Sequence, residues 1–206
     1  MEAAVITPTE NIGSSEQNGS SGGARTLGLL QDLLLREEAT SDCYQLKKNI
    51  TIHPLALDGE WRNKLYKWFF DVVDHFEYDR DVVFIALNYL DRVLVATRTS
   101  EGQHSAIPKR EIQLFATTCL YLAIKLHGTI STDEKFTKQM LPVALFVKLS
   151  QKAFSEDMIL ATELRILNIL KWRVNPSTCT SFIVCLLRLF PKGTQRTVVV
   201  DVMWEA

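Results

Sequence analysis

The chain has 206 residues, of which 47% are hydrophobic and 23% charged, a balance typical of a globular protein with one good core and part of another. It carries 23 Lys and Arg residues against 24 Asp and Glu residues. Because the net charge is close to zero, we expect no general nucleic-acid-binding surface.

The beginning of the chain, "MEAAVITPTE", lacks the basic and apolar regions of a secretory signal, and the apolar runs are too short to span a bilayer. We therefore expect an intracellular protein with no membrane partner. The four cysteines show no C-x-x-C spacing and the four histidines are scattered. This spacing predicts neither a disulfide nor a metal site, and we expect no cofactor.

The first 57 residues are expected to lie outside the main domain. Residues 1–25 include "TPTENIGSSEQNGSSGGAR", which is polar and has no apolar periodicity, so a disordered tail is predicted. Residues 26–57 are predicted to form a leucine-rich helix, "TLGLLQDLLLREEA", followed by a polar connector.

A helical pattern begins after Asp58. Five helices are predicted, over residues 60–77, 81–96, 108–126, 142–150 and 155–170. Residues suited to a helix start precede or open all five of them: Asp58, Asp79, Pro108, Pro142 and Ser155. The third helix, "IQLFATTCLYLAIKL", is apolar on nearly every side, which predicts a central helix surrounded by others.

Two further helical features are predicted around and after this bundle. Ser131 and Glu134 match a capping box, which predicts a short helical turn in the polar loop after the third helix. Asn175 and Pro176 are expected to cap and open another helix, "STCTSFIVCLLRLFP", and "TQRTVVVDVMWEA" predicts one more.

The predicted fold class is therefore all-α, with a five-helix domain over residues 58–174 and the beginning of a second helical repeat over residues 175–206. No strand-like alternation of any length occurs, and neither a phosphate-binding glycine loop nor a catalytic motif is found. We expect no enzymatic activity.

Two charged residues lie in apolar stripes. Lys125 lies inside the run "LYLAIKLHG", and Glu163 is flanked at helical spacing by Ile159, Leu160 and Ile166. Lys125 can extend its ammonium into water, the two charges can pair within the chain, or they can lie at the edge of a surface that a partner covers. The last interpretation is favoured by apolar residues near the same helix ends: Leu122, Leu126, Trp172 and Val174.

A second pair of charges is interpreted as structural. Arg62 shares a side of the first helix with apolar residues, and Asp91 has apolar neighbours one turn away on the second helix. Leaving one such charge buried alone costs about 3–5 kcal/mol. We therefore expect Arg62 and Asp91 to form an ion pair between these two helices.

Along the first helix, Trp61, Leu65 and Trp68 recur at spacings of four and three residues. Such a stripe is either part of the core or one wall of a shallow groove for a short peptide. In the second case Asp71, one turn further, is expected to bind a basic residue of that peptide.

Four segments together resemble the cyclin box: "WRNKLYKWFFDVV", "ALNYLDRVLVA", "IQLFATTCLYLAIKL" and "ELRILNILKWRVNPSTCTSFI". The resemblance covers about residues 58–191, and the Arg62 and Asp91 positions match a buried ion pair of that family. It implies a five-helix cyclin-box bundle with a truncated second cyclin fold.

The resemblance also implies a function. It implies a regulatory subunit, in the nucleus and cytoplasm, that binds and activates a cyclin-dependent protein kinase in cell-cycle control. The positions expected to contact the kinase are Lys125, Glu163, Leu122, Leu126, Trp172 and Val174. A docking groove for short peptide motifs of kinase substrates or inhibitors is expected at Trp61, Leu65, Trp68, Asp71 and Gln113.

The sequence departs from the family pattern at several of these positions. Trp61 and Lys64 stand where cyclins often carry Met and an aliphatic residue, and His127 with Gly128 replaces a frequent acidic pair. An alternative function is that of a cyclin-box interaction protein of the transcription machinery without a kinase-activating role, and an inactive gene remnant is a third. The near-neutral charge does not favour contact with nucleic acid.

Overall fold

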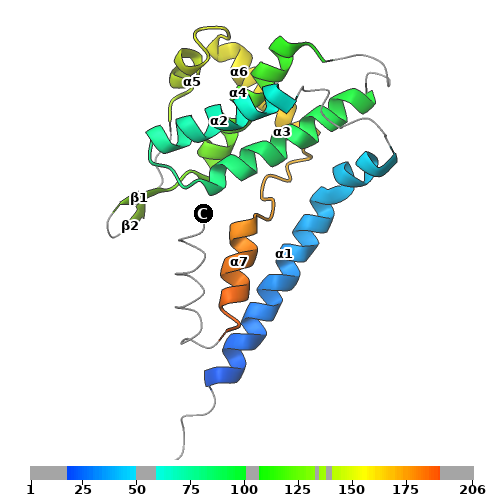
Figure 1. The fold of residues 1–206 in the computed structure, drawn as a ribbon, viewed down its shortest axis with the longest axis vertical. Coiled ribbons are helices and arrows are strands. Elements are labelled where there is room, and N and C mark those ends of the chain that lie inside the picture. The colour runs from blue at the N-terminus through cyan, green and yellow to red at the C-terminus, as the bar shows by residue number, and fades with distance from the viewer. Residues whose placement is uncertain (1–17, 50–58, 101–106, 133–134, 138–140, 191–206) are drawn as a thin grey trace, which may run out of the picture. The chain divides into compact units, whose positions relative to one another are not determined.

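The computed structural model describes residues 18–49, 59–100, 107–132, 135–137 and 141–190. Seven helices and two short strands lie within these residues (Figure 1). In chain order they are α1 (Asn18–Asn49), α2 (Gly59–His75), α3 (Asp81–Ser100), α4 (Lys109–His127), β1 (Ile130–Thr132), β2 (Lys135–Thr137), α5 (Val143–Leu149), α6 (Glu156–Ile169) and α7 (Cys179–Leu187). The all-α fold class expected from the sequence is confirmed, apart from the small strand pair.

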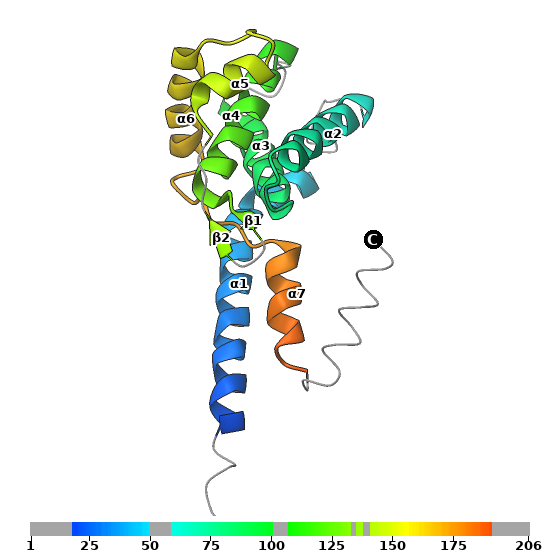
Figure 2. The same ribbon diagram turned by 90° about the vertical axis from the view of Figure 1, so that its left-hand side faces the viewer.

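The chain divides into two compact units, the larger formed by Leu34–Ser181. At the centre of the larger unit α4 packs against α3, α5 and α6, and α2 packs against α3. Figure 2 shows α4 between α3 and α6. Every residue from Phe115 to Ile124 is buried. This explains the apolar character of α4 on all sides and agrees with the central position predicted for it.

Local capping signals place several helix starts where the sequence predicts them. The Ser155 hydroxyl accepts a hydrogen bond from the Met158 amide at 3.3 Å, and two acidic residues follow in the first turn of α6. Asp79 Oδ1 accepts a hydrogen bond from the Asp81 amide at 2.9 Å where α3 begins. Pro108 is the N-cap of α4 rather than its first helical residue.

Gly128 ends α4 by a close approach to another side chain. Its amide donates to the Ile124 carbonyl at 2.8 Å. A Cβ atom at this position would lie 2.5 Å from the same carbonyl oxygen and 2.9 Å from a ring carbon of Tyr78. Only glycine fits this position without displacing backbone, which gives a physical reason for the Gly128 departure noted in the sequence.

The helical turn predicted at Ser131 is wrong. Ile130–Thr132 instead forms β1, which pairs with β2 in an antiparallel register that places Ser131 opposite Phe136. The capping-box pattern is a local signal, whereas Ile130 and Thr132 are β-branched and favour an extended backbone once a partner strand is present. The other half of the predicted box, Glu134, lies outside the described residues.

Both ends of helix α1 also differ from the prediction. Helix α1 begins at Asn18 and continues to Asn49, so residues 18–25 and 40–49 extend the predicted helix into the expected tail and connector. Adding residues to an existing helix gains one hydrogen bond for each residue ordered, which lets the leucine-rich part propagate into sequence of poor helix propensity. The remaining tail and Asp58 lie outside the described residues.

Asn175 and Pro176 do not open the next helix, which corrects that prediction. Helix α7 begins at Cys179, and the Thr178 hydroxyl accepts a hydrogen bond from the Ser181 amide at 3.2 Å. Thr178 is buried and also donates to Asp81 Oδ2 at 2.8 Å, so a tertiary contact selects it as the cap. The segment "TQRTVVVDVMWEA" lies outside the described residues.

The smaller unit comprises Met1–Leu33 and Phe182–Ala206. Within it Cys185 is buried, and its thiol donates to the Thr26 carbonyl at 3.4 Å. Several apolar side chains of this unit are exposed, among them Leu27, Ile183 and Phe190. Across the helices that the structure describes, none combines the length and hydropathy needed to cross a membrane.

Candidate protein-binding site

Lys125 and Glu163 meet within the chain. Lys125 lies in the last turn of α4 and Glu163 on α6, and Lys125 Nζ donates to Glu163 Oε1 at 2.8 Å. The side chain of Glu163 is 10% exposed and that of Lys125 33%. The hydrogen bond to Glu163 raises the pKa of Lys125 above its ordinary value, against the opposing effect of burial. Neither charge needs a second molecule for neutralisation, which corrects the explanation preferred from sequence.

The pair nevertheless keeps capacity for a further partner. An ammonium has three N–H donors, and one third of the Lys125 side chain reaches solvent. The ring of Tyr121 lies beneath it, with its centroid 5.4 Å from Lys125 Nζ. Lys125 is therefore held in one orientation by Glu163 and Tyr121 while part of it stays accessible.

The apolar residues expected beside this pair differ in exposure. Trp172 is 62% exposed, whereas Leu126 and Val174 are partly buried against the core. Leu122 is 1% exposed and cannot contact a partner, which corrects its assignment as a contact residue. It faces inward because α4 is surrounded by other helices.

Two residues of α6 form an apolar surface that the sequence interpretation did not include. Leu160 and Leu164 are 43% and 56% exposed, and they stand three residues before and one residue after Glu163. From the sequence, Leu160 was identified only as a neighbour of Glu163. Helical periodicity reveals an apolar stripe but does not show whether that stripe is buried or exposed. We call Leu160, Glu163, Leu164, Lys125 and Trp172 the α6 surface.

The turn that follows α6 presents Trp172 to solvent. Lys171 and Trp172 both have left-handed backbone conformations, with φ of 52° and 59°. The buried guanidinium of Arg92 on α3 holds this turn by donating to the carbonyls of Arg173 at 2.8 Å and Leu170 at 3.1 Å. A cation at the carboxyl end of a helix also interacts favourably with its dipole.

A second set of hydrogen bonds holds the same segment at Val174. His127 Nε2 lies 2.7 Å from the Val174 carbonyl and 3.0 Å from the Tyr89 hydroxyl, which also donates to that carbonyl. Tyr89 is fully buried, and burial raises its pKa. Both Tyr89 and Arg92 were missed from the sequence, where each looks like an ordinary residue of an amphipathic helix.

Arg62 and Asp91 lie together as the sequence predicts. Arg62 Nη2 donates to Asp91 Oδ2 at 3.2 Å, which joins α2 to α3. Their side chains are 30% and 13% exposed. The Arg62 guanidinium also lies over the ring of Tyr66 and hydrogen-bonds its hydroxyl. This clasp orients α2, which carries one wall of the groove described next.

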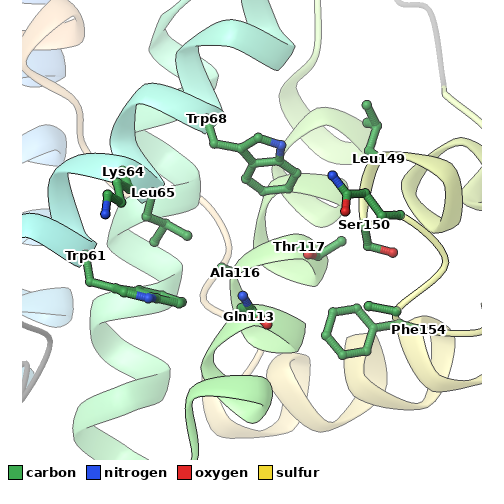
Figure 3. A pocket seen from close by; sticks show the side chains of 12 residues that line it. Trp61, Lys64, Leu65, Trp68, Gln113, Ala116, Thr117, Leu149, Ser150 and Phe154 are labelled. Atoms are coloured by element: carbon green, nitrogen blue, oxygen red, sulfur yellow. The ribbon is translucent and has the colours of Figure 1, made fainter.

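A groove of about 540 Å³ lies between α2, α4 and the segment from Leu149 to Phe154. Figure 3 shows Trp61, Leu65 and Trp68 on one wall, residues of α4 at the floor, and Leu149, Ser150 and Phe154 opposite. The complete lining is Trp61, Lys64, Leu65, Trp68, Gln113, Ala116, Thr117, Leu149, Ser150, Gln151, Ala153 and Phe154.

Four of the five predicted groove residues therefore line a real depression. Asp71 does not belong to the lining, which corrects the expectation that it binds a basic residue there. Lys64 lines the groove instead. The reason is helical geometry, because residue 64 falls between the two tryptophans along the helix, whereas residue 71 lies beyond the second of them.

The described residues hold no group of three or more His, Cys, Asp or Glu side chains placed to bind a metal ion. Cys119, Cys179 and Cys185 are free thiols, and burial raises the pKa of the Cys119 thiol. Cys43 is outside the part of the chain whose side chains are described. The α6 surface and the groove consist of charged, polar, aromatic and aliphatic groups, which are suited to contact with another protein.

Comparison with known proteins gives a consistent similarity. The family model described as "Cyclin, N-terminal domain" matches residues 31–175, so the match begins within α1, earlier than the 58–191 resemblance. The chain is 29% identical over 132 residues to G2/mitotic-specific cyclin S13-7 of Glycine max, covering 64% of this chain and 45% of that protein. It is 30% identical over 136 residues to G1/S-specific cyclin-D2 of Rattus norvegicus, covering 66% and 41%. The chain spans less than half the length of these relatives.

Proposed function

The chain belongs to the cyclin family, and from this premise we propose that it is a regulatory subunit, rather than an enzyme, that binds and activates a cyclin-dependent protein kinase. The observation that carries the proposal is the α6 surface, where exposed Leu160 and Leu164 flank the Glu163 of the Lys125–Glu163 pair along α6, and exposed Trp172 follows the end of that helix. A fixed polar pair within an apolar area is the usual composition of a protein interface.

The exposed indole of Trp172 supports this proposal further. Tryptophan is enriched among the residues that dominate binding energy at interfaces. Here the indole is attached to a turn held by Arg92 and by the Tyr89 and His127 contacts to Val174. Because the backbone of this turn is already held, less conformational entropy is lost there when a partner binds.

Activation would follow from preferential binding. A protein kinase is active when its catalytic lysine pairs with a glutamate on a mobile helix. A subunit that binds the state with that helix correctly placed shifts the kinase toward it. Moving a population from about 1:99 to about 99:1 requires about 10⁴-fold tighter binding to the active state, or about 5.5 kcal/mol.

The cellular role is proposed from the relatives. Their names are G1/S-specific or G2/mitotic-specific cyclins, including G1/S-specific cyclin-E1 of Mus musculus. We infer a role in cell-cycle control, in the nucleus and cytoplasm, with the groove of Figure 3 docking short peptide motifs of kinase substrates or inhibitors. Neither nucleic acid nor a membrane is proposed as a partner.

A pull-down from cell extract tests kinase binding. The tagged full chain is compared with Lys125→Glu, with Glu163→Lys and with the double variant in which the two charges are exchanged. Each single substitution places like charges at a site now occupied by an ion pair, so binding can fail through unfolding. The exchanged variant restores the pair but reverses the charges that a kinase meets.

The expected result is that the wild type retains a protein kinase and that both single variants and the exchanged variant lose it. Helical circular dichroism should show the exchanged variant folded. If the exchanged variant binds the kinase as well as the wild type does, the charges act only through folding and the interface assignment is wrong. If the wild type retains no kinase, the proposed function is overturned.

Trp172→Ala provides an independent test, because a side chain with 62% exposure contributes little to the core. Phe84→Ala is the matched control, since Phe84 is an exposed aromatic residue on α3 with 50% exposure. We expect the first substitution to weaken kinase retention at least tenfold and the second to leave it unchanged. Equal effects of the two substitutions would contradict the proposed interface.

A further inference from the structure

The groove between α2, α4 and Leu149–Phe154 has an unbalanced charge. Among the described residues that line it, Lys64 is the only one with a charged side chain. The remaining lining is aromatic, aliphatic or neutral and polar. The carboxylate expected from sequence at Asp71 is outside the lining, so the charged side chain that lines the groove is a cation.

The ammonium of Lys64 can accept a new partner at low cost. It now pairs with Glu60 Oε1 at 2.7 Å, one helical turn away, and both side chains are about 70% exposed. Exposed pairs of this kind contribute only a few tenths of a kcal/mol. A peptide carboxylate can therefore share or replace the contact with Glu60.

Charges of both signs occur in and next to the segment that forms the opposite wall. The Arg110 guanidinium donates to the carbonyl of the lining residue Ala153 at 3.4 Å. Lys152 is exposed within the segment, and Glu156 and Asp157 follow it in the first turn of α6. None of these four charged side chains belongs to the lining, whereas Lys64 does.

The positions of the two indoles suggest how a peptide is spaced. Trp61 and Trp68 are seven residues apart on α2, or about 10 Å along the axis at 1.5 Å per residue. Three residues of an extended polyproline-type peptide span about 9 Å and return to the same face. Lys64 lies between the indoles along the helix, at the margin of this wall, and its ammonium is directed away from the cavity (Figure 3). A peptide carboxylate would therefore meet it at the edge of the groove.

We propose that this groove binds an extended peptide with two apolar anchors three residues apart and an acidic residue between them. The apolar anchors contact the indoles and Phe154, and the peptide carboxylate pairs with Lys64. This assignment deepens the docking role proposed above and rests on it for its biological meaning. Peptide binding itself requires no kinase and can be measured on the full chain alone.

The test uses fluorescence anisotropy with three labelled peptides that share a Phe and a Leu three residues apart. The two residues between them are Glu-Glu, Ser-Ser or Lys-Lys. We expect the Glu peptide to bind about two- to fivefold more tightly than the Ser peptide, the range for an exposed ion pair, and the Lys peptide to bind more weakly than both. The preference should shrink at about 0.5 M salt, where charges are screened within a few ångströms.

Two substitutions on the same helix make the test specific. Lys64→Glu should reverse the order of the Glu and Lys peptides. Lys67→Glu is the matched control, because Lys67 is also exposed but does not line the groove. Each substitution places a new acid four residues from an existing one, Glu60 or Asp71. Lys64→Glu also removes the exposed pair with Glu60, which contributes only a few tenths of a kcal/mol. Lys67→Glu should leave the order of the peptides unchanged.

The outcomes separate the acidic preference from the docking role. If all three peptides bind equally, or if Lys64→Glu and Lys67→Glu act alike, the acidic preference is refuted while apolar docking stands. If the Lys peptide binds best to the wild type, the charge assignment is reversed and the inference fails. If none of the peptides binds, both the inference and the docking role are overturned, whereas kinase binding through the α6 surface is judged by the pull-down.

Discussion

The Lys125–Glu163 pair predicts an unequal response to the loss of its two members. Lys125→Met leaves the carboxylate of Glu163, which is 10% exposed, without its cation. Glu163→Gln leaves an ammonium on a flexible side chain that is 33% exposed and can reach water. Removing the lysine should therefore cost more stability than neutralising the glutamate.

The expected loss of stability depends on how deeply the ion pair is buried, and it falls between two limits. Breaking a fully buried pair costs about 3–5 kcal/mol, and losing an exposed one costs less than about 1 kcal/mol. Because Glu163 is nearly buried and Lys125 is only partly so, we expect about 2–3 kcal/mol for Lys125→Met and about 1 kcal/mol for Glu163→Gln. The double variant should cost less than the sum of the two, because no stranded charge remains.

Urea unfolding of the wild type, the two single variants and the double variant at about pH 7 measures these differences. In the wild type the hydrogen bond to Glu163 raises the pKa of Lys125 above its ordinary value. Its stabilising contribution is complete below about pH 10.4, the ordinary lysine pKa, and is lost as the pH rises through the higher folded-state value.

Two results would refute this reasoning. If Glu163→Gln destabilises as much as Lys125→Met, the exposure of the two side chains does not decide the cost. If the effects of the single substitutions simply add in the double variant, the two groups do not interact in solution, whatever their 2.8 Å separation in the structure.

Three further predictions concern stability and use the same unfolding measurement. Gly128→Ala should cost at least about 1–3 kcal/mol, because its Cβ would lie 2.5 Å from a backbone oxygen; an unchanged midpoint would contradict the close approach. Ser155→Ala should cost about 1 kcal/mol through loss of the cap on α6, while Ser155→Asp should retain it; equal losses would argue against capping. Arg62→Met should cost about 1–3 kcal/mol by leaving Asp91 unpaired, and the additional change Asp91→Asn should recover part of that loss; no recovery would show that the pair contributes little.

The sequence by itself determined most of the larger unit. Helix starts at Asp79 and Ser155 follow from side-chain oxygens that bind nearby amides, an interaction between residues two or three positions apart. The central position of α4 follows from its lack of a polar face. The Arg62–Asp91 pair was predictable because two opposite charges on apolar stripes have few other ways to be neutralised.

The tertiary structure decided which side of each apolar stripe stays exposed. Periodicity defines a stripe on a helix but not its rotation against the neighbouring helices, so sequence did not distinguish buried Leu122 from exposed Leu164. The sequence also assigned Asp71 to the groove, although this residue lies beyond Trp68 along α2 and outside the lining. The extent of the groove along α2 depends on where α4 and the Leu149–Phe154 segment lie.

Long-range contacts decided two further features. The cap of α7 depends on the contact between Thr178 and Asp81, 97 residues apart. The turn that presents Trp172 depends on Arg92 from α3, which lies 78 residues before the Leu170 carbonyl that it binds. A local sequence window contains only one member of each of these pairs, so the backbone hydrogen bonds and buried charges that form between distant segments appear only once the chain has folded.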